Sequence, residues 1–185
     1  EAGRMNECLE PVRASLDRID ELTWRDNKVT GYENHIRLVS SSDCNGDIES
    51  FSRELETFIQ KASLREPFGE TVRLGFLGVP PIFDDIHDTV ESFGARIVFN
   101  EVQRQFSLPV RDSGLVDQYL AYTYPYDIFH RLDYIIPELK RRNIQGVIHY
   151  VQSFCHRHIE DLVLRKKLPL PVLTIEGETP GNADE

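Results

Sequence analysis

Residues 146–161 read Gly146-Val147-Ile148-His149-Tyr150-Val151-Gln152-Ser153-Phe154-Cys155-His156-Arg157-His158-Ile159-Glu160-Asp161. An apolar run ends at a cysteine between two histidines, and an amphipathic segment follows at once. This order is typical of a buried β-strand that carries a thiol at its carboxyl end, beside the amino end of a helix. Parallel sheets bind ligands outside the carboxyl ends of their strands, and a helix amino end favours a thiolate. Cys155 is therefore a candidate functional thiolate, and the alternative is a small buried hydrophobic residue.

Outward from this stretch, short apolar runs alternate with amphipathic segments from residue 72 onward. The predicted strands cover 72–78, 95–100, 146–151 and 171–176. The predicted helices cover 82–93, 114–123, 128–142 and a segment from about 154 to 167, with Gly94 as a stop signal. Such alternation predicts an α/β fold with a four-stranded parallel sheet, flavodoxin- or Rossmann-like, and helices on both faces.

Before residue 70 the pattern is helical and charged. Apolar residues recur at helical spacing over about 5–24 and again over 47–61, and a polar segment, 40–46, precedes the second run. Neither predicted helix contains a group of residues typical of a catalytic or binding site, so both are expected to pack over a hydrophobic core. We expect a helical lead-in over 1–70 and an α/β domain over 71–185.

Composition excludes several classes of protein. Hydrophobic residues make up 40% and charged residues 28% of the 185, the balance of an ordinary globular protein. The net charge of -10 argues against a nucleic-acid partner, and no apolar run is long enough for a membrane span. The three cysteines are widely spaced in sequence, which favours a reducing cytoplasm over a disulfide framework.

The predicted topology raises every loop that follows a strand at the same edge of the sheet. These loops carry Cys155 and two carboxylates, Glu101 and Glu176, which are candidate catalytic residues from strand-end geometry alone. Pro80 and Pro81 stiffen the first loop. Convergence of polar groups at this edge predicts a site without naming its reaction.

Several familiar sites are disfavoured. No glycine-rich nucleotide fingerprint follows a strand, and no G-x-S-x-G nucleophile elbow is present. His149, His156 and His158 lie near Cys155 in sequence, but a strand followed by a helix would separate them, so zinc binding by this segment alone is disfavoured. The aromatic cluster at 122–126 is expected to pack in a core, with a substrate-lining wall as the alternative.

The longer motifs resemble those of the 2-hydroxyacyl-CoA dehydratase D-component family, which includes 2-hydroxyglutaryl-CoA dehydratase and benzoyl-CoA reductase subunits. The matching stretches are 74–81, 101–104, 122–129, 146–161 and 173–177, and the resemblance is clearest from about 70 to 181. It implies a radical enzyme of anaerobes that acts on a coenzyme A thioester. In such systems an ATP-dependent iron–sulfur activator injects one electron, which passes through a [4Fe-4S] cluster and forms a ketyl radical on the substrate.

On this resemblance, Cys155 corresponds to the cluster-binding cysteine of the family's second domain. The family draws its other cysteine ligands from a preceding domain that this chain lacks, and Cys8 and Cys44 do not match those ligand motifs. We therefore expect the chain by itself to be an inactive half-site of a lyase, or of an oxidoreductase if the reaction is ring reduction. It would work with a second subunit, the activator and an acyl-CoA substrate.

Two alternatives remain from other classes of protein. The chain could be a non-catalytic electron-transfer or docking domain of an activator protein in the same system. It could also be a small-ligand-binding α/β domain in which Cys155 is inert. The roles of His149, His156 and His158, hydrogen bonding to cluster sulfurs or simple capping and packing, are open at this point.

Overall fold

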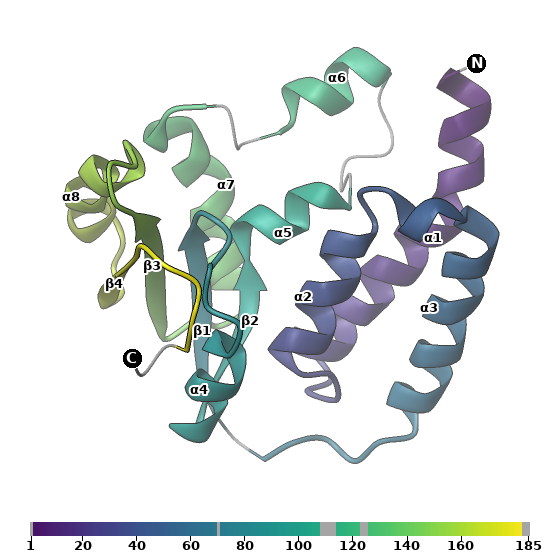
Figure 1. Ribbon diagram of the computed structural model, residues 1–185, viewed down its shortest axis with the longest axis horizontal. Coiled ribbons are helices and arrows are strands. Elements are labelled where there is room, and N and C mark those ends of the chain that lie inside the picture. Colours follow the sequence, from purple (N-terminus) through teal and green to yellow (C-terminus); the bar gives the residue numbers. More distant parts are fainter. Residues whose placement is uncertain (1, 70, 108–113, 123–125, 183–185) are drawn as a thin grey trace. The chain divides into compact units, whose positions relative to one another are not determined.

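The computed structural model describes residues 2–69, 71–107, 114–122 and 126–182 (Figure 1). The chain divides into two compact units, of which the first comprises Glu1–Gly69 with Gln103–Tyr122. The second comprises Glu70–Val102 with Thr123–Glu185. No helix in the described part of the chain is both long and apolar enough to cross a membrane.

The first unit is helical. It contains α1 (Ala2–Trp24), α2 (Gly31–Ser40), the 3-10 helix η1 (Cys44–Gly46), α3 (Ile48–Ser63) and α6 (Leu115–Leu120). Helices α1 and α3 confirm the two amphipathic runs predicted from the sequence. Helix α6 is shorter than the predicted segment 114–123, whose last residue lies outside the described residues.

Helix α2 was not predicted, although its start carries a local signal. The Thr30 hydroxyl accepts a hydrogen bond from the Glu33 N–H at 3.1 Å. In return, the Glu33 carboxylate accepts one from the Thr30 N–H at 3.0 Å. This reciprocal capping box satisfies two backbone donors that a helix amino end otherwise leaves open.

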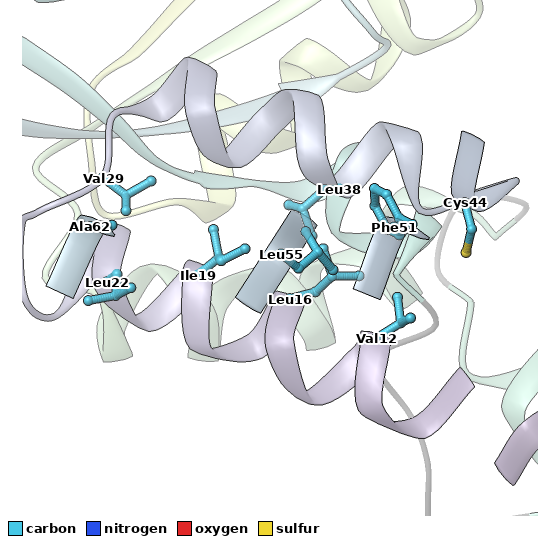
Figure 2. Packing of buried hydrophobic residues seen from close by; sticks show 10 residues of the cluster. All are labelled: Val12, Leu16, Ile19, Leu22, Val29, Leu38, Cys44, Phe51, Leu55 and Ala62. Atoms are coloured by element: carbon cyan, nitrogen blue, oxygen red, sulfur yellow. The ribbon is translucent and has the colours of Figure 1, made fainter. Parts of the chain in front are cut away.

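The core of the first unit is almost purely aliphatic and aromatic. Side chains from α1, α2 and α3 point toward one another in Figure 2, with Leu16 and Leu55 near the middle of the cluster. The buried members are Val12, Leu16, Ile19, Leu22, Val29, Leu38, Cys44, Phe51, Leu55 and Ala62. Their spacing of three and four residues along α1 places them on one stripe of that helix.

The second unit contains the sheet. Its strands are β1 (Val72–Gly78), β2 (Ala95–Asn100), β3 (Gly146–Gln152) and β4 (Val172–Gly177), all parallel and in the order β2-β1-β3-β4. This arrangement confirms the predicted four-stranded parallel sheet. In the register of the sheet, His149 on β3 lies between Leu77 on β1 and Thr174 on β4.

Helices cover both faces of this sheet, as predicted. They are α4 (Ile86–Ser92) on one face, and α7 (Ile128–Arg141) and α8 (Arg157–Lys167) on the other. Successive side chains of a strand point to opposite faces. Accordingly, Ile148 and Tyr150 pack with the apolar residues of α4, whereas His149 bonds to Asp161 of α8.

Three predicted boundaries were wrong. Helix α8 begins at Arg157 and not near residue 154, because the chain makes a turn in which the Cys155 N–H donates to the Gln152 carbonyl. The predicted helix 82–93 begins only at Ile86, because tertiary contacts hold the residues before it: the Ile82 N–H donates to the Tyr150 hydroxyl at 3.1 Å, and the Phe83 ring meets that tyrosine edge-on. The predicted loop after β2 is instead the start of a short helix, α5 (Glu101–Phe106). Gly94 has φ 75° after the last turn of α4, as expected of a helix stop.

Candidate functional site

The turn between β3 and α8 presents Cys155 at the edge predicted from the sequence. The Cys155 N–H donates to the Gln152 carbonyl at 2.9 Å, and the His158 N–H donates to the Cys155 carbonyl at 3.0 Å. His156 is the N-cap of α8, so the thiol lies immediately before the amino end of that helix. Cys155 is a free cysteine, and the residue is partly exposed.

Phe154, next to this thiol, adopts a left-handed backbone conformation with φ 63°. Its aromatic side chain is fully exposed. A non-glycine residue at positive φ is strained, and an aromatic ring in water gives up the free energy of burial. The turn that presents Cys155 therefore carries a local energetic cost.

Glu101 is deeply buried at the start of α5, with 1% of its surface exposed. Both of its carboxylate oxygens accept hydrogen bonds from Arg131 of α7, each at 2.7 Å. The Gly78 N–H at the end of β1 also points at this carboxylate, 3.5 Å away. Glu101 therefore ties together the carboxyl ends of β1 and β2 and the helix α7.

Arg131 extends this ion pair to α8. Its guanidinium also donates to Glu160, which in turn lies 3.8 Å from Arg157. Burial alone would lower the pKa of Arg131, but hydrogen bonds to Glu101 and Glu160 and their negative charges raise it above its ordinary value. The result is a layer of alternating charges beneath the strand ends.

His149 forms a second polar group on the same face of the sheet. Its imidazole is fully buried, and Nδ1 lies 3.0 Å from Asp161 Oδ1. Asp161 also accepts hydrogen bonds from Arg165, at 2.5 Å, and from the Thr174 hydroxyl. Burial would raise the pKa of Asp161, but the bonds from Thr174, Arg165 and His149 outweigh it and lower the pKa to about 2.

Glu176, the other predicted carboxylate, lies at the exposed end of β4. The Ser153 hydroxyl is within hydrogen-bond distance of Glu176, at 2.7 Å, and of Glu178. Because a serine has one proton, it donates to one of these carboxylates at a time. His158 Nδ1 lies 3.9 Å from Glu176 Oε2 on the other side.

The two predicted carboxylates therefore lie in different neighbourhoods. Glu101 belongs to the buried layer with Arg131, whereas Glu176 belongs to an exposed cluster with Ser153. Both neighbourhoods include residues from the first turn of α8. This helix supplies Glu160 to the buried layer and His158 to the exposed cluster.

Sequence reasoning missed Arg131 and the partner of His149. Arg131 lies in the middle of the buried stripe of α7, between Ile128 and Ile135, and a charge at such a position was a usable signal. Asp161 carried no comparable signal, because it is one acidic residue in a helix rich in charge. Its pairing with His149 spans 12 residues and depends on the packing of α8 on the sheet.

The other cysteines and the aromatic cluster lie elsewhere. Cys8 is exposed and Cys44 is buried, both in the first unit, and burial raises the pKa of the Cys44 thiol. Of the aromatic residues at 122–126, Tyr122 neighbours Tyr119 and Tyr126 neighbours His130, while 123–125 lie outside the described residues. The predicted packing of that cluster is therefore untested as a whole.

The first unit also contains an open groove of about 600 Å³ between α2 and α3. Three cationic side chains, Arg37, Arg53 and Lys61, contribute to its lining. The guanidinium of Arg37 lies 3.4 Å from the centre of the Phe58 ring, a cation–π contact. Nothing in the sequence pattern indicated this groove.

Comparison with known proteins adds one finding. The family model described as 2-hydroxyglutaryl-CoA dehydratase, D-component, matches residues 6–185. No match is found among curated proteins.

Proposed function

Because the chain belongs to the 2-hydroxyglutaryl-CoA dehydratase D-component family, we propose that it works in an iron–sulfur 2-hydroxyacyl-CoA dehydratase. The proposed reaction removes water from a 2-hydroxyacyl thioester of coenzyme A by one-electron chemistry. The observation that carries the proposal in this chain is the placement of Cys155, a free and partly exposed thiol at the carboxyl end of β3. Ring reduction of the benzoyl-CoA type is the related reaction that the same site would serve.

Cys155 fits the role of one cluster ligand. Thiolates are the usual protein ligands of iron–sulfur clusters, and this thiol lies immediately before the amino end of α8. A [4Fe-4S] cluster takes about four such ligands, and we propose that the others come from another domain or subunit of the assembled enzyme. When bound, the cluster would supply the single electron that activates the thioester.

The other residues of the edge would hold the site in shape. The bidentate pair of Glu101 and Arg131 joins two strand ends to α7, and Glu160 joins them to α8. Such a network fixes the position of groups that meet a ligand, which is the protein's share in cofactor chemistry. Glu101 thus acts as a positioning residue in this proposal, and Glu176, exposed beside Ser153, is the carboxylate that a ligand could contact.

The proposed partners are a second dehydratase subunit and an ATP-dependent iron–sulfur activator. The family match supports a multi-component dehydratase, and the finer assignments are part of the proposal. A β-hydrogen of an acyl thioester is too weakly acidic for an ordinary base to remove, so the thioester must first be activated by one electron. That step needs an external reductant of very low potential. An activator of this chemical class would meet that need.

The test is the iron and acid-labile sulfide content of the enzyme assembled with its partner subunit and purified without oxygen. We expect about four irons for the cluster of this subunit, lost in Cys155→Ala and kept in the matched variant Cys8→Ala, whose thiol is exposed in the first unit. Full iron in Cys155→Ala would show that Cys155 is no ligand. Absence of iron from the wild-type assembly after reconstitution would instead favour a binding or docking role.

A further inference from the structure

The groove between α2 and α3 in the first unit is large enough for a small ligand. Its volume of about 600 Å³ lies within the range of about 300–1,000 Å³ that is typical of ligand sites. Two of the residues that line it, Phe51 and Leu55, also belong to the buried core shown in Figure 2. Close packing of that core holds these side chains in place, so this wall of the groove exists before a ligand binds.

The charges that line the groove are mostly positive. Arg37 of α2 and Arg53 and Lys61 of α3 contribute cations, and Glu54 contributes the opposing charge. The whole chain has a net charge of -10, so this excess of cations is a local exception. Exposed charges more than about 8 Å apart are largely screened at physiological salt, so the nearby cations decide which ligands the groove attracts. An anionic ligand is therefore favoured.

Arg37 forms no ion pair in the described part of the chain. Its guanidinium donates to the Glu33 carbonyl at 2.8 Å, whereas the Glu33 carboxylate accepts hydrogen bonds from Arg65, two of them at 2.8 Å. Burial lowers the pKa of Arg37 and the positive charge of Arg65 adds to this effect, while Glu33 and Glu54 oppose it. An anion in the groove would stabilise this partly buried cation.

The lining favours an extended ligand over a single small ion. Arg53 and Lys61 are eight residues apart on α3, so their Cα atoms are roughly 12 Å apart along the helix. Apolar surface is also present, because Ile36 is 41% exposed and Phe58 lines the groove beside Arg37. Phosphates bind arginine and lysine, and planar bases pack on apolar and aromatic side chains. A nucleotide combines both kinds of group.

We propose that this groove binds a nucleotide, whose phosphates contact Arg37, Arg53 and Lys61 and whose base packs on Ile36 and Phe58. Two sources share this chemistry, a free nucleoside diphosphate and the nucleotide end of coenzyme A. The groove lies within the first unit and contains no residue of the Cys155 neighbourhood, so the site goes beyond the function proposed above.

Calorimetric titration of the full chain with ADP, coenzyme A or inorganic phosphate tests this site. We expect ADP or coenzyme A to bind with a Kd below about 1 mM and at least about tenfold more tightly than phosphate. Replacing both Arg53→Ala and Lys61→Ala should weaken this binding at least about tenfold, because charge-assisted hydrogen bonds are lost. The matched control, Lys140→Ala with Lys166→Ala, has the same net charge but loses exposed cations of the second unit, and it should stay within about twofold of wild type.

The outcomes name the source of the ligand or overturn the proposal. Binding of ADP at least as tight as that of coenzyme A would assign the groove to a free nucleotide, and tighter binding of coenzyme A would assign it to the coenzyme. The proposal is overturned if neither binds below about 1 mM, if phosphate binds as tightly, or if the variant with both Arg53→Ala and Lys61→Ala binds like wild type.

A salt titration keeps the proposal testable if that variant does not fold. Wild-type affinity should fall as the NaCl concentration is raised from about 0.05 to 0.5 M, because the attraction between charges is screened, and an unchanged affinity would overturn the proposal equally. Binding is measured without iron or turnover, so these outcomes are independent of those that test the dehydratase function.

Discussion

The cores of the two units differ in where their buried charges lie. In the first unit, α1 buries Leu16, Ile19 and Leu22 in an apolar cluster (Figure 2), and its buried charged residues, Arg13 and Asp20, are not members of that cluster. In the second unit, the space between the sheet and its helices holds Arg131 and His149, both fully buried. The free energy gained by burying apolar side chains is non-directional and depends mainly on the area and volume buried. A buried charge is stable only with a particular partner at hydrogen-bonding distance.

This difference shows where the molecule can carry chemistry. The apolar core holds helices together and tolerates residues of similar volume. The polar layer lies under the carboxyl edge of the sheet. The hydrogen bonds from Arg131 to Glu101 and Glu160 offset the free-energy cost of removing these charges from water. Substitutions that keep the side-chain volume but remove hydrogen-bonding groups should therefore cost more stability in the polar layer than in the apolar core.

The largest effect is expected for Arg131→Met. It leaves the buried Glu101 carboxylate without its cation and Glu160 with only Arg157, 3.8 Å away, and we expect a loss of about 3–5 kcal/mol in the free energy of unfolding, measured by chemical denaturation. The matched control is Arg141→Met on the same helix: that side chain is about half exposed in its ion pair with Glu138, and its loss should cost less than about 1 kcal/mol. A loss below about 1 kcal/mol in Arg131→Met would mean that the layer is not a structural element.

A nearly equal loss is expected for Leu16→Ala in the first unit, about 3 kcal/mol, because the cavity adds to the lost transfer free energy. Leu64→Ala, at a position 87% exposed, is the control and should change stability by less than about 0.5 kcal/mol. The comparison sharpens with conservative changes. Leu16→Met should cost less than about 1.5 kcal/mol, whereas Arg131→Lys should recover little, since lysine lacks the planar fork.

Acid should weaken the second unit through Asp161. Its pKa lies near 2 in the folded chain against an ordinary value of 3.8, so the folded state binds the proton less readily than the unfolded state. The stabilisation is present above pH 4 and is lost as the pH falls through about 2, a change of about 2 kcal/mol. Denaturation curves across this window should show the loss in wild type and its absence in Asp161→Asn.

His149 adds a separate and higher window. Its folded-state pKa is lowered by burial, so its contribution to stability is present above about pH 6.5 and is lost as the pH falls through the lower folded-state value. His149→Gln should remove the part of the pH dependence that lies below pH 6.5 and above the Asp161 window. An unchanged profile in that variant would contradict a neutral buried imidazole.

The smallest effect is expected at the turn before Cys155. Phe154→Gly should raise the free energy of unfolding by about 0.5–1 kcal/mol, because glycine adopts φ 63° without strain. Phe93→Gly is the matched control: that phenylalanine is also exposed, but its φ of -86° is ordinary, so no gain is expected. A loss of stability in Phe154→Gly would show that the ring makes contacts that stabilise the chain.

Much of the fold could be predicted from the sequence because its signals are local. β1 and β2 occupy the predicted residues, since short apolar runs bounded by turn residues are characteristic of buried parallel strands. Helix α2 was missed because its capping box was overlooked, a signal that was present. The start of α4 could not be predicted, because the hydroxyl of Tyr150 that holds Ile82 lies 68 residues away.

The amino-acid sequence alone determined the strand–helix alternation, the parallel sheet and the position of Cys155 at the end of β3. These features follow from the hydrophobic periodicity of short segments and from the residues adjacent to them in sequence. Only the tertiary structure decided that Glu101 is bound by Arg131, 30 residues away, and that His149 pairs with Asp161 of α8. Buried charges acquire their partners when distant elements pack, so their roles depend on distances that no local pattern contains.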